Sequence, residues 1–544
     1  MTEASTEANT NEAAAELLPL DMLDAAAGLA DPATVLRAMP WLAGELAKVA
    51  LGRSDVWFGE RDKRFADGAW QLPYFRMLGQ SYRLYELWMD RMVDSVDGCW
   101  QRQARARWLA DLMTAAASPA NYLPTNPVAM REAVQTRGLS LLHGMQNFVA
   151  DLARGGMPRG ADRKPFVVGE QVACTPGAVV YREEMFELLQ YSPVTQKVRA
   201  VPLLIVPPQV NRYYILDLAP GRSLAEFAVQ QGIGTFMIVW RNPRGDLGHG
   251  RWGLDDYIAA QERAAAVVKK IARSQKVSWL GLCAGGMTVA FMLGHLAATG
   301  DESAASATYL VTMLSGREPN AVGMLDTGQF RARLTRAARA GQVVPATALR
   351  TLFALLRPND LVYGYLVSGW LLGKPPAAFD VLAWNDDASS VPAKFALDTT
   401  ELVLDGWDGL AGPTILGTTA DLGAVGCDSF HVAGYTDHIT HWRACYSTTQ
   451  LLGGDKELTV VKSGHIQSFV NPAATGRYDC WYGPPTASEP DKWLSEATVQ
   501  PGSWWQRWAD WLIARSGAQR AARPTLGNRE YPPLGTAPGK YAHS

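Results

Sequence analysis

The stretch Val277-Ser278-Trp279-Leu280-Gly281-Leu282-Cys283-Ala284-Gly285-Gly286 is followed by the uncharged run Met287–Leu293. The two apolar runs predict a buried strand and a helix, and the residues between them predict a sharp turn with Cys283 at its tip. Gly281 and Gly285 flank the cysteine at the spacing of a nucleophile elbow, where backbone segments approach too closely for side chains. The sequence therefore predicts an elbow that presents a sulfur nucleophile.

The predicted elbow suits acyl transfer. The turn would hold the Cys283 thiol above the end of a sheet, and the backbone amide of Ala284 would face the oxyanion of a tetrahedral intermediate. A thiol in place of the usual hydroxyl favours a thioester as the acyl donor. The motif taken alone leaves an alternative open, because most free cysteines are small buried hydrophobic residues.

Two later segments supply an acid and a histidine in the chain order that hydrolase-type folds use. The strand-like stretch that begins at Phe430 leads into a loop with Asp437, and Glu457–Lys462 predicts a strand followed by a loop with His465. A cysteine, an acid and a histidine in this order predict a catalytic triad of Cys283, Asp437 and His465.

Other residues could fill the same roles. His438 and His441 are alternative bases, but His438 adjoins the acid, which cannot easily orient it, so contact with substrate or shaping of the loop is its expected role. Asp421 and Asp428 are alternative acids that precede the predicted strand instead of following it. Asp437 therefore remains the expected acid.

The pattern of helices and strands predicts two folded domains. Residues 1–35 are expected to be disordered, residues 36–163 to form a helical N-terminal domain, and residues 164–544 to form the catalytic domain. The Gly- and Pro-rich segment Arg154–Asp162 marks the boundary. Apolar runs then alternate with helical stretches, which indicates a mostly parallel sheet covered on both faces. The runs are Val201–Val206, Thr235–Trp240, Val277–Leu282 and Thr308–Leu314.

The fold class predicted from these patterns is an α/β-hydrolase fold with a helical cap insertion. The cap is expected over about 318–412, where the pattern changes to helices and loops, and it would exclude water from the acyl-enzyme. Within it, Leu361–Gly373 is the longest uncharged run and is shorter than the roughly 20 residues of a membrane helix. In the N-terminal domain, an apolar stripe at helical spacing predicts either core or a face for a hydrophobic product. The stripe comprises Tyr82, Tyr85, Met89 and Met92.

Composition limits the possible functions. The 544 residues are 48% hydrophobic and 19% charged with a net charge of −2, which gives no concentrated basic face for nucleic acid. The six cysteines form neither a metal-type pair nor a disulfide framework, so we expect a reducing cytoplasm, no bound metal and no redox cofactor. The first residues, 1–15, have no basic patch followed by an apolar stretch, which argues against a secretory signal.

Several further motifs occur in the order of one enzyme family, and on them the chain resembles polyhydroxyalkanoate synthases, which polymerise 3-hydroxyacyl-CoA thioesters into storage polyester. The resemblance runs from about Phe65 to the C-terminus. It includes the cysteine elbow and the loops of the acid and the histidine. The other motifs are Arg64–Trp70, Pro202–Pro208 with Asn211, Trp240–Pro243, Arg357–Leu361 and Gly502–Trp505.

The resemblance implies roles for the residues. Cys283 would be the acylated nucleophile, His465 the base and Asp437 the third member. Independently of the resemblance, the Ala284 amide and the loop from Val206 to Asn211 are the candidates for the oxyanion or substrate site. Coenzyme A would enter as part of the substrate, with no other cofactor. The resemblance also implies a cytoplasmic enzyme on polyester granules that holds the nascent chain and works as a homodimer.

The phrases Asp437–Thr440, Ser463–Ser468 and Arg251–Leu254 are more similar to single-polypeptide synthases that favour medium-chain monomers. The segment Ser389–Asp398 departs from many relatives, which carry aromatic and arginine residues there. Two other functions stay open. A thioesterase or depolymerase of the same fold would release free hydroxy acid, and a granule-binding protein would have lost its catalytic residues.

Overall fold

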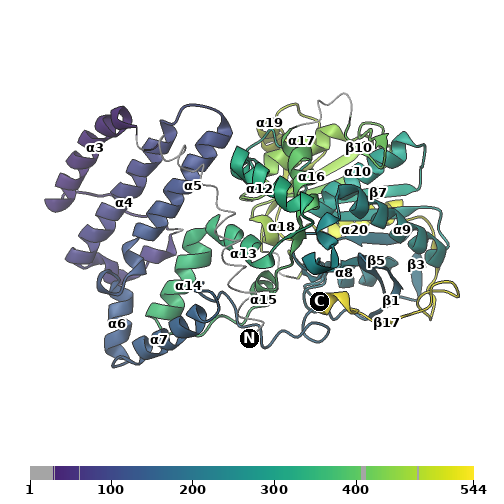
Figure 1. Cartoon of the computed structure of the whole chain (residues 1–544), viewed down its shortest axis with the longest axis horizontal. Coiled ribbons are helices and arrows are strands. Elements are labelled where there is room, and N and C mark those ends of the chain that lie inside the picture. The colour runs from purple at the N-terminus through teal and green to yellow at the C-terminus, as the bar shows by residue number, and fades with distance from the viewer. Residues whose placement is uncertain (1–28, 30, 61, 406–411, 475–476) are drawn as a thin grey trace. The chain divides into compact units, whose positions relative to one another are not determined.

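The computed structural model describes residues 29, 31–60, 62–405, 412–474 and 477–544, and they form two compact units (Figure 1). The N-terminal unit extends to Asp162 and includes Thr327–Phe330 and Thr347–Leu382. The second unit, here called the sheet unit, comprises Arg163–Asp326, Arg331–Ala346 and Ala383–Ser544. The insertion predicted over 318–412 is thus divided between the two units, and its residues 406–411 lie outside the described ones.

The N-terminal unit is built from helices. Most of the segment predicted to be disordered lies outside the described residues, but helix α3 begins at Pro32, before the expected boundary at residue 36. Two of its helices, α3 and α6, start with a proline after a capping side chain, Asp31 or Asn126, because proline and capping side chains suit the unpaired amides of a first turn. The main helices are α3 (Pro32–Ala50), α4 (Pro73–Asp94), α5 (Trp100–Ala117), α6 (Pro127–Gln135) and α7 (Leu139–Leu152).

The apolar stripe of α4 packs in the interior of this unit. Met89 and Met92 lie in a buried cluster with Val93 and alanines of α5, and Tyr85 packs against the same cluster. Tyr82 is buried beside Phe65 and Trp70. The stripe is therefore core, and the alternative of a face for a hydrophobic product is wrong for these residues.

Two motifs that are distant in the sequence meet within the N-terminal unit. The Arg64 guanidinium donates to Asn359 Oδ1 over 2.8 Å and also pairs with Glu86 at 3.0 Å. Asn359 begins the π-helical turn η8 (Asn359–Tyr363), which leads through α14 (Gly364–Leu366) into η9 (Val367–Leu371). A Cβ on Gly144 of α7 would lie 1.9 Å from the Trp370 carbonyl oxygen, so the contact between α7 and η9 requires glycine.

The sheet unit is organised around a sheet of eleven strands in the order β15-β14-β13-β12-β7-β6-β4-β5-β2-β1-β17. The strands from β5 to β13 in this order run parallel, and antiparallel strands continue the sheet on both sides. The predicted α/β-hydrolase fold with a mostly parallel sheet is confirmed. The strands are β1 (Gly177–Arg182), β2 (Phe186–Tyr191), β4 (Leu203–Val206), β5 (Thr235–Trp240), β6 (Val277–Leu282), β7 (Ala304–Leu310), β12 (Asp428–Gly434), β13 (Lys456–Val461), β14 (Cys480–Gly483), β15 (Thr498–Gln500) and β17 (Gly535–Thr536).

Helices join these strands and pack on them. The last long one, α20, contacts β7. A strand was expected over Thr308–Leu314, but the strand there, β7, covers Ala304–Leu310. It ends at Leu310 because Val311 takes a positive φ of 44°, which breaks the extended backbone. No helix in the described ranges is long and apolar enough to cross a membrane. The helices are α8 (Leu224–Gln230), α9 (Leu254–Ala272), α10 (Ala284–Ala298), α11 (Ala321–Leu325), α16 (Ala393–Leu404), α17 (Trp442–Leu451), α18 (His465–Phe469), α19 (Pro490–Glu496) and α20 (Trp505–Arg515), while α12 (Gly328–Arg339), α13 (Ala346–Leu355) and α15 (Asp380–Asp386) carry residues of both units.

Candidate active site

Cys283 sits at a strained turn between β6 and α10. Its backbone has φ 51° and ψ −117°, a conformation that non-glycine residues rarely adopt outside functional turns. Its amide donates to the Leu310 carbonyl of the neighbouring strand β7 over 2.8 Å, which holds the turn in place. A Cβ on Gly281 would lie 2.4 Å from Gly286 Cα, so the flanking glycines are required by contact. The geometry is that of a nucleophile elbow.

The end of β4 packs directly against the first turn of the elbow helix. A Cβ on Gly285 would lie 2.5 Å from the Val206 carbonyl oxygen and 2.6 Å from that of Pro207. The Trp240 indole donates to the Pro207 oxygen over 2.9 Å and fixes this segment. The amide of Ala284 opens α10, where the helix dipole favours a developing negative charge. Ala284 and Val206 therefore lie on adjoining segments beside the nucleophile.

The structure does not place Asn211 among the catalytic side chains. Its φ is 79°, and its side chain accepts from the Arg212 amide over 3.0 Å, so it shapes its own turn. It lines a small cavity together with Trp240, Arg241 and Tyr541, and none of Cys283, Asp437 and His465 lines that cavity.

The acid and the histidine follow two neighbouring parallel strands. Asp437 lies in the loop after β12, and His465 is the first residue of α18 after β13. His465 Nδ1 and Asp437 Oδ2 are 2.6 Å apart, and both side chains are buried. Asp437 Oδ1 accepts from the amides of Ile439 and Thr440 over 2.8 and 3.1 Å. These bonds orient the carboxylate toward the imidazole.

The histidine also lies beside the nucleophile, since Cys283 is among the groups that act on the charge of His465. Burial would lower the pKa of His465, but the charge of Asp437, its hydrogen bond and the contact with Cys283 raise that pKa well above its ordinary value. Burial would raise the pKa of Asp437, but the charge of His465 and the bonds that the carboxylate accepts hold that pKa below its ordinary value. The two shifts agree on a charged pair, Asp437⁻ with His465⁺.

The alternative acids and bases have other positions. His438 is exposed, and His441 caps α17 by accepting from the Arg443 amide. Asp428 pairs with Arg515 at 2.8 Å, and Asp421 accepts from the Ala424 amide over 3.0 Å. Each of these contacts serves local structure, so the geometry selects Asp437 and His465.

Sequence reasoning missed one member of this cluster, Thr440. Its hydroxyl donates to Asp437 Oδ2 over 2.9 Å and lies 3.3 Å from His465 Nδ1. The sequence gives a weak signal, because Asp side chains in turns often bond to groups a few residues later in the chain. Asp437 Oδ2 therefore accepts from both Thr440 and His465.

A polar cluster under the elbow was also missed. Thr288 Oγ1 donates to the Gly285 carbonyl and accepts from the amide groups of Gln261 and Gln209, at 2.6 and 3.3 Å. It connects the loop after β4 to the elbow helix. Across the ranges that the structure describes, no group of three or more His, Cys, Asp or Glu side chains could hold a metal ion.

Comparison with known proteins gives two family matches. Residues 61–228 match the N-terminal domain of poly-beta-hydroxybutyrate polymerase, and residues 226–472 match the α/β-hydrolase fold. "Poly(3-hydroxyalkanoate) polymerase 2" of Ectopseudomonas oleovorans is 40% identical over 92% of this chain and 90% of its own length. "Poly(3-hydroxyalkanoate) polymerase 1" of the same organism is 38% identical over 92% of this chain and 89% of its own. The "Poly(3-hydroxyalkanoate) polymerase subunit PhaC" of Cupriavidus necator is 38% identical over 91% and 85%.

Proposed function

This chain belongs to the family of poly(3-hydroxyalkanoate) polymerases, and we propose that it polymerises (R)-3-hydroxyacyl groups from coenzyme A thioesters into a polyester through an acyl-enzyme on Cys283. The observation that carries the proposal is the buried His465–Asp437 pair, with Cys283 on a nucleophile elbow beside it. The enzyme is an acyltransferase whose leaving group is coenzyme A. The substrate brings this coenzyme, and the reaction requires no other.

The proton of the Cys283 thiol passes to His465, which gives the imidazolium of the charged pair described above, and the thiolate then attacks the thioester carbonyl carbon. Because Nδ1 of His465 is bonded to Asp437, the other ring nitrogen, Nε2, is left for the sulfur. The amide of Ala284 stabilises the oxyanion, together with a donor from the segment after Val206. The bond to coenzyme A then breaks, and the imidazolium returns its proton to the departing thiolate.

Chain growth requires a hydroxyl group to attack the acyl-cysteine. The 3-hydroxyl of a second monomer or of the chain end loses its proton, forms the new ester bond and releases the Cys283 thiolate. Sequence alone left either Asp437 or His465 as the base for this step. Both carboxylate oxygens of Asp437 already accept hydrogen bonds, from two amides, Thr440 and His465. This favours His465 as the base in both half-reactions.

A hydrolase of the same fold is the second candidate, and the relatives do not favour it, because the three described above are polymerases by name. For the monomer, we propose a medium-chain 3-hydroxyacyl group. The support is the similarity of Asp437–Thr440 and Ser463–Ser468 to the medium-chain branch.

We also propose that the protein works in the cytoplasm on polyester granules, as a homodimer, and that helix α7 contacts the granule. Its exposed apolar residues recur every three or four positions and so share one face. Its only charged residue, Asp151, is buried and pairs with Arg159 at 2.7 Å. An apolar face without charge suits an insoluble polyester. The exposed residues of α7 are Leu139, Leu142, Met145, Phe148, Val149 and Leu152.

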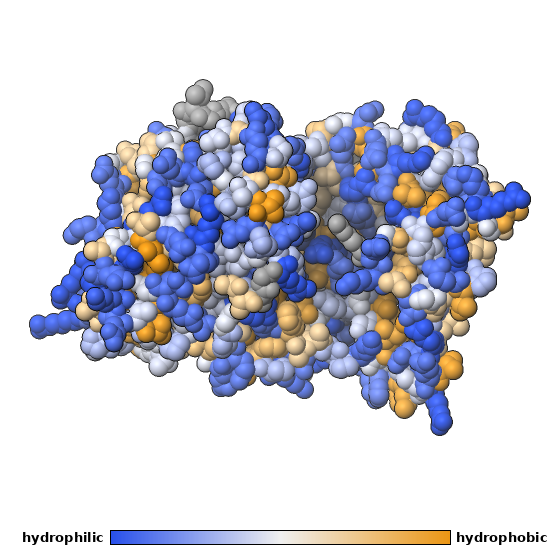
Figure 2. Space-filling model, turned by 180° about the vertical axis from the view of Figure 1, so that it is seen from behind, coloured by the Kyte–Doolittle hydropathy of each residue, from blue (hydrophilic) through white to orange (hydrophobic). Residues whose placement is uncertain are grey.

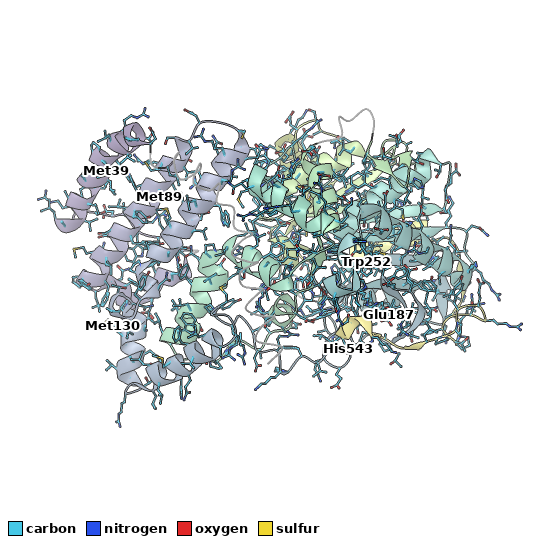
Figure 3. All side chains as sticks on the ribbon, in the orientation of Figure 1. Met39, Met89, Met130, Glu187, Trp252 and His543 are labelled. Atoms are coloured by element: carbon cyan, nitrogen blue, oxygen red, sulfur yellow. The ribbon has the colours of Figure 1, made fainter. Side chains whose placement is uncertain are left out.

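Exposed apolar residues are frequent elsewhere on the N-terminal unit, and orange side chains are visible on its surface at the right of Figure 2. In Figure 3, Met39 of α3, Met89 of α4 and Met130 of α6 are labelled. Met39 and Met130 are exposed, whereas Met89 is 4% exposed and belongs to the core. The apolar surface therefore extends beyond α7.

The test supplies purified protein with 3-hydroxybutyryl-CoA and 3-hydroxydecanoyl-CoA in parallel, and measures released coenzyme A and the size of the acyl product. We expect polyester from the longer monomer. Polyester from the shorter monomer alone would overturn the chain-length proposal, and free hydroxy acid from both would assign the protein to the hydrolases. Light scattering of the active fraction tests the dimer.

A further inference from the structure

The base is carried by a very short helix. Helix α18, His465–Phe469, has five residues, fewer than a helix needs to be stable on its own. Its last carbonyl groups also lack partners within the helix and must find donors elsewhere. Because His465 opens this helix, whatever holds α18 in place also decides where the imidazole lies.

The donors come from the Gly502–Trp505 motif, to which the mechanism gives no role. The Trp504 indole donates to the Ser468 carbonyl over 2.7 Å, and the Trp505 indole donates to the Phe469 carbonyl over 3.1 Å. The Ser503 hydroxyl donates to the carbonyl of Asn471, just beyond the helix. Both indoles are 2% exposed, so water cannot replace these bonds.

Contacts at the other end of α18 carry this support to the imidazole. The Ser468 hydroxyl donates to the Gly464 carbonyl over 2.7 Å, directly before His465. The Phe469 ring meets the His465 ring edge to face, with centroids 6.1 Å apart. A displacement at the Ser468 or Phe469 carbonyl therefore reaches His465 through packed groups.

The motif itself stands on a rigid base. Helix α20, which begins at Trp505, is fastened to the sheet, since the Trp508 indole donates to Thr308 Oγ1 on β7 over 3.0 Å. At its C-terminal end, Arg515 pairs with Asp428 of β12 at 2.8 Å. Ser503, Trp504 and Trp505, here called the clamp residues, are thus fixed to the same sheet that carries the elbow and the acid.

We propose that Ser503, Trp504 and Trp505 are positioning residues, which hold α18 so that His465 reaches both Cys283 and Asp437. This inference rests on the catalytic roles given to Cys283 and His465 under the proposed function. None of the three clamp residues needs to touch substrate. They act through the backbone of α18.

The test compares Trp504→Phe and Trp505→Phe, which remove the indole N–H and keep an aromatic ring, with Trp493→Phe. The control removes the indole bond of a similarly buried tryptophan on α19, which donates to the Pro484 carbonyl over 3.1 Å and contacts neither α18 nor α20 through that bond. Coenzyme A release from 3-hydroxydecanoyl-CoA should show kcat reduced about 10- to 100-fold in the two clamp variants, because small misplacements of a catalytic group are costly. KM should change less than about twofold, since only the position of the base is altered.

A second readout follows the position of the base directly. The rate of Cys283 alkylation by iodoacetamide is measured against pH in each protein. In the clamp variants, a looser contact with Asp437 should move the inflection that reports His465 deprotonation to lower pH. Trp493→Phe should keep the wild-type profile, even where its melting temperature falls as much as that of the clamp variants.

Three outcomes would overturn the proposal: folded clamp variants with wild-type kcat, an unchanged alkylation profile, or an equal loss of kcat in Trp493→Phe. If Trp504→Phe does not fold, Ser503→Ala removes one hydroxyl and is held to the same criteria. Alkylation does not depend on polymer synthesis. If the wild-type protein releases no coenzyme A but the clamp variants still shift the alkylation profile, the proposed function is refuted and the positioning role is supported.

Discussion

His465 Nδ1 lies 2.6 Å from Asp437 Oδ2, although 28 positions separate the two residues in the chain. The contact follows from strand pairing, because β12 and β13 are parallel neighbours with Gly434 opposite Val461. The loops beyond them are also joined, since the Thr436 amide donates to the Ser463 carbonyl over 3.0 Å. The sheet therefore fixes the acid and the base to each other, and the elbow on β6 presents the thiol to this pair.

Replacing the nucleophile should abolish the first half-reaction. Cys283→Ala is expected to reduce coenzyme A release by about 10³-fold or more, because no acyl-enzyme can form. The matched control is Cys99→Ala, an exposed cysteine of the N-terminal unit that should keep wild-type activity. The measurement is a thiol assay on 3-hydroxydecanoyl-CoA, and an unaffected rate in Cys283→Ala would remove this residue from the mechanism.

The charged pair predicts a defined pH dependence of stability. The pKa of His465 is raised above 6.5, so its contribution is fully present below pH 6.5 and is lost as the pH rises through the higher folded value. The pKa of Asp437 is lowered below 3.8, so its contribution is present above that pH and is lost on further acidification. The difference in urea midpoint between wild type and Asp437→Asn should therefore be largest between pH 3.8 and 6.5. A difference that grows from pH 7 to pH 10 would contradict the assigned pair.

The hydroxyl of Thr440 should matter for catalysis as well as for stability. Thr440→Val removes the bond to Asp437 Oδ2, and we expect kcat to fall about fivefold, the effect of roughly 1 kcal/mol of lost orientation. Thr449→Val is the control, because that buried hydroxyl donates to the Tyr446 carbonyl within α17. The two variants should lose similar stability in thermal melts, and only Thr440→Val should lose activity.

The contact between the elbow and β4 predicts a steric effect. Gly285→Ala would place a methyl group 2.5 Å from the Val206 carbonyl oxygen, so either α10 or the end of β4 must shift. We expect a loss of about 1–3 kcal/mol in unfolding free energy and a reduced kcat. Gly234→Ala, with nothing within 4 Å of the added carbon, should be close to neutral. Equal stability and activity in both variants would show that the close approach has no effect.

The apolar face of α7 should be required for binding to polyester. Leu142→Glu combined with Val149→Glu places two charges on exposed positions and should leave more protein in the supernatant after sedimentation with granules. Val194→Glu alters an equally exposed apolar residue of the sheet unit and should bind normally. Coenzyme A release from soluble substrate should be unchanged in both the double variant and the control. Normal sedimentation of the double variant would exclude α7 as the granule contact.

Patterns in the sequence were sufficient wherever the cause of the structure is local. The strands predicted over Thr235–Trp240 and Val277–Leu282 are β5 and β6 with the same bounds, since continuous apolar runs specify buried strands. The turn at Cys283 is predictable because Gly281 is required by a contact with Gly286, five positions along the chain. The chain order of Cys283, Asp437 and His465 followed from the same fold, and the structure brings these side chains together.

Other features depend on residues that are far apart in the chain, and only the tertiary structure decided them. The α4 stripe and the exposed face of α7 have similar periodicity, but a neighbouring helix covers only the first. Arg64 meets Asn359, and so part of the predicted cap insertion joins the N-terminal unit. The indole bonds from Trp504 and Trp505 to α18 join segments 36 positions apart. Periodicity determines which surfaces of this protein are apolar, but long-range packing and hydrogen bonds decide which of them are buried and which groups hold His465.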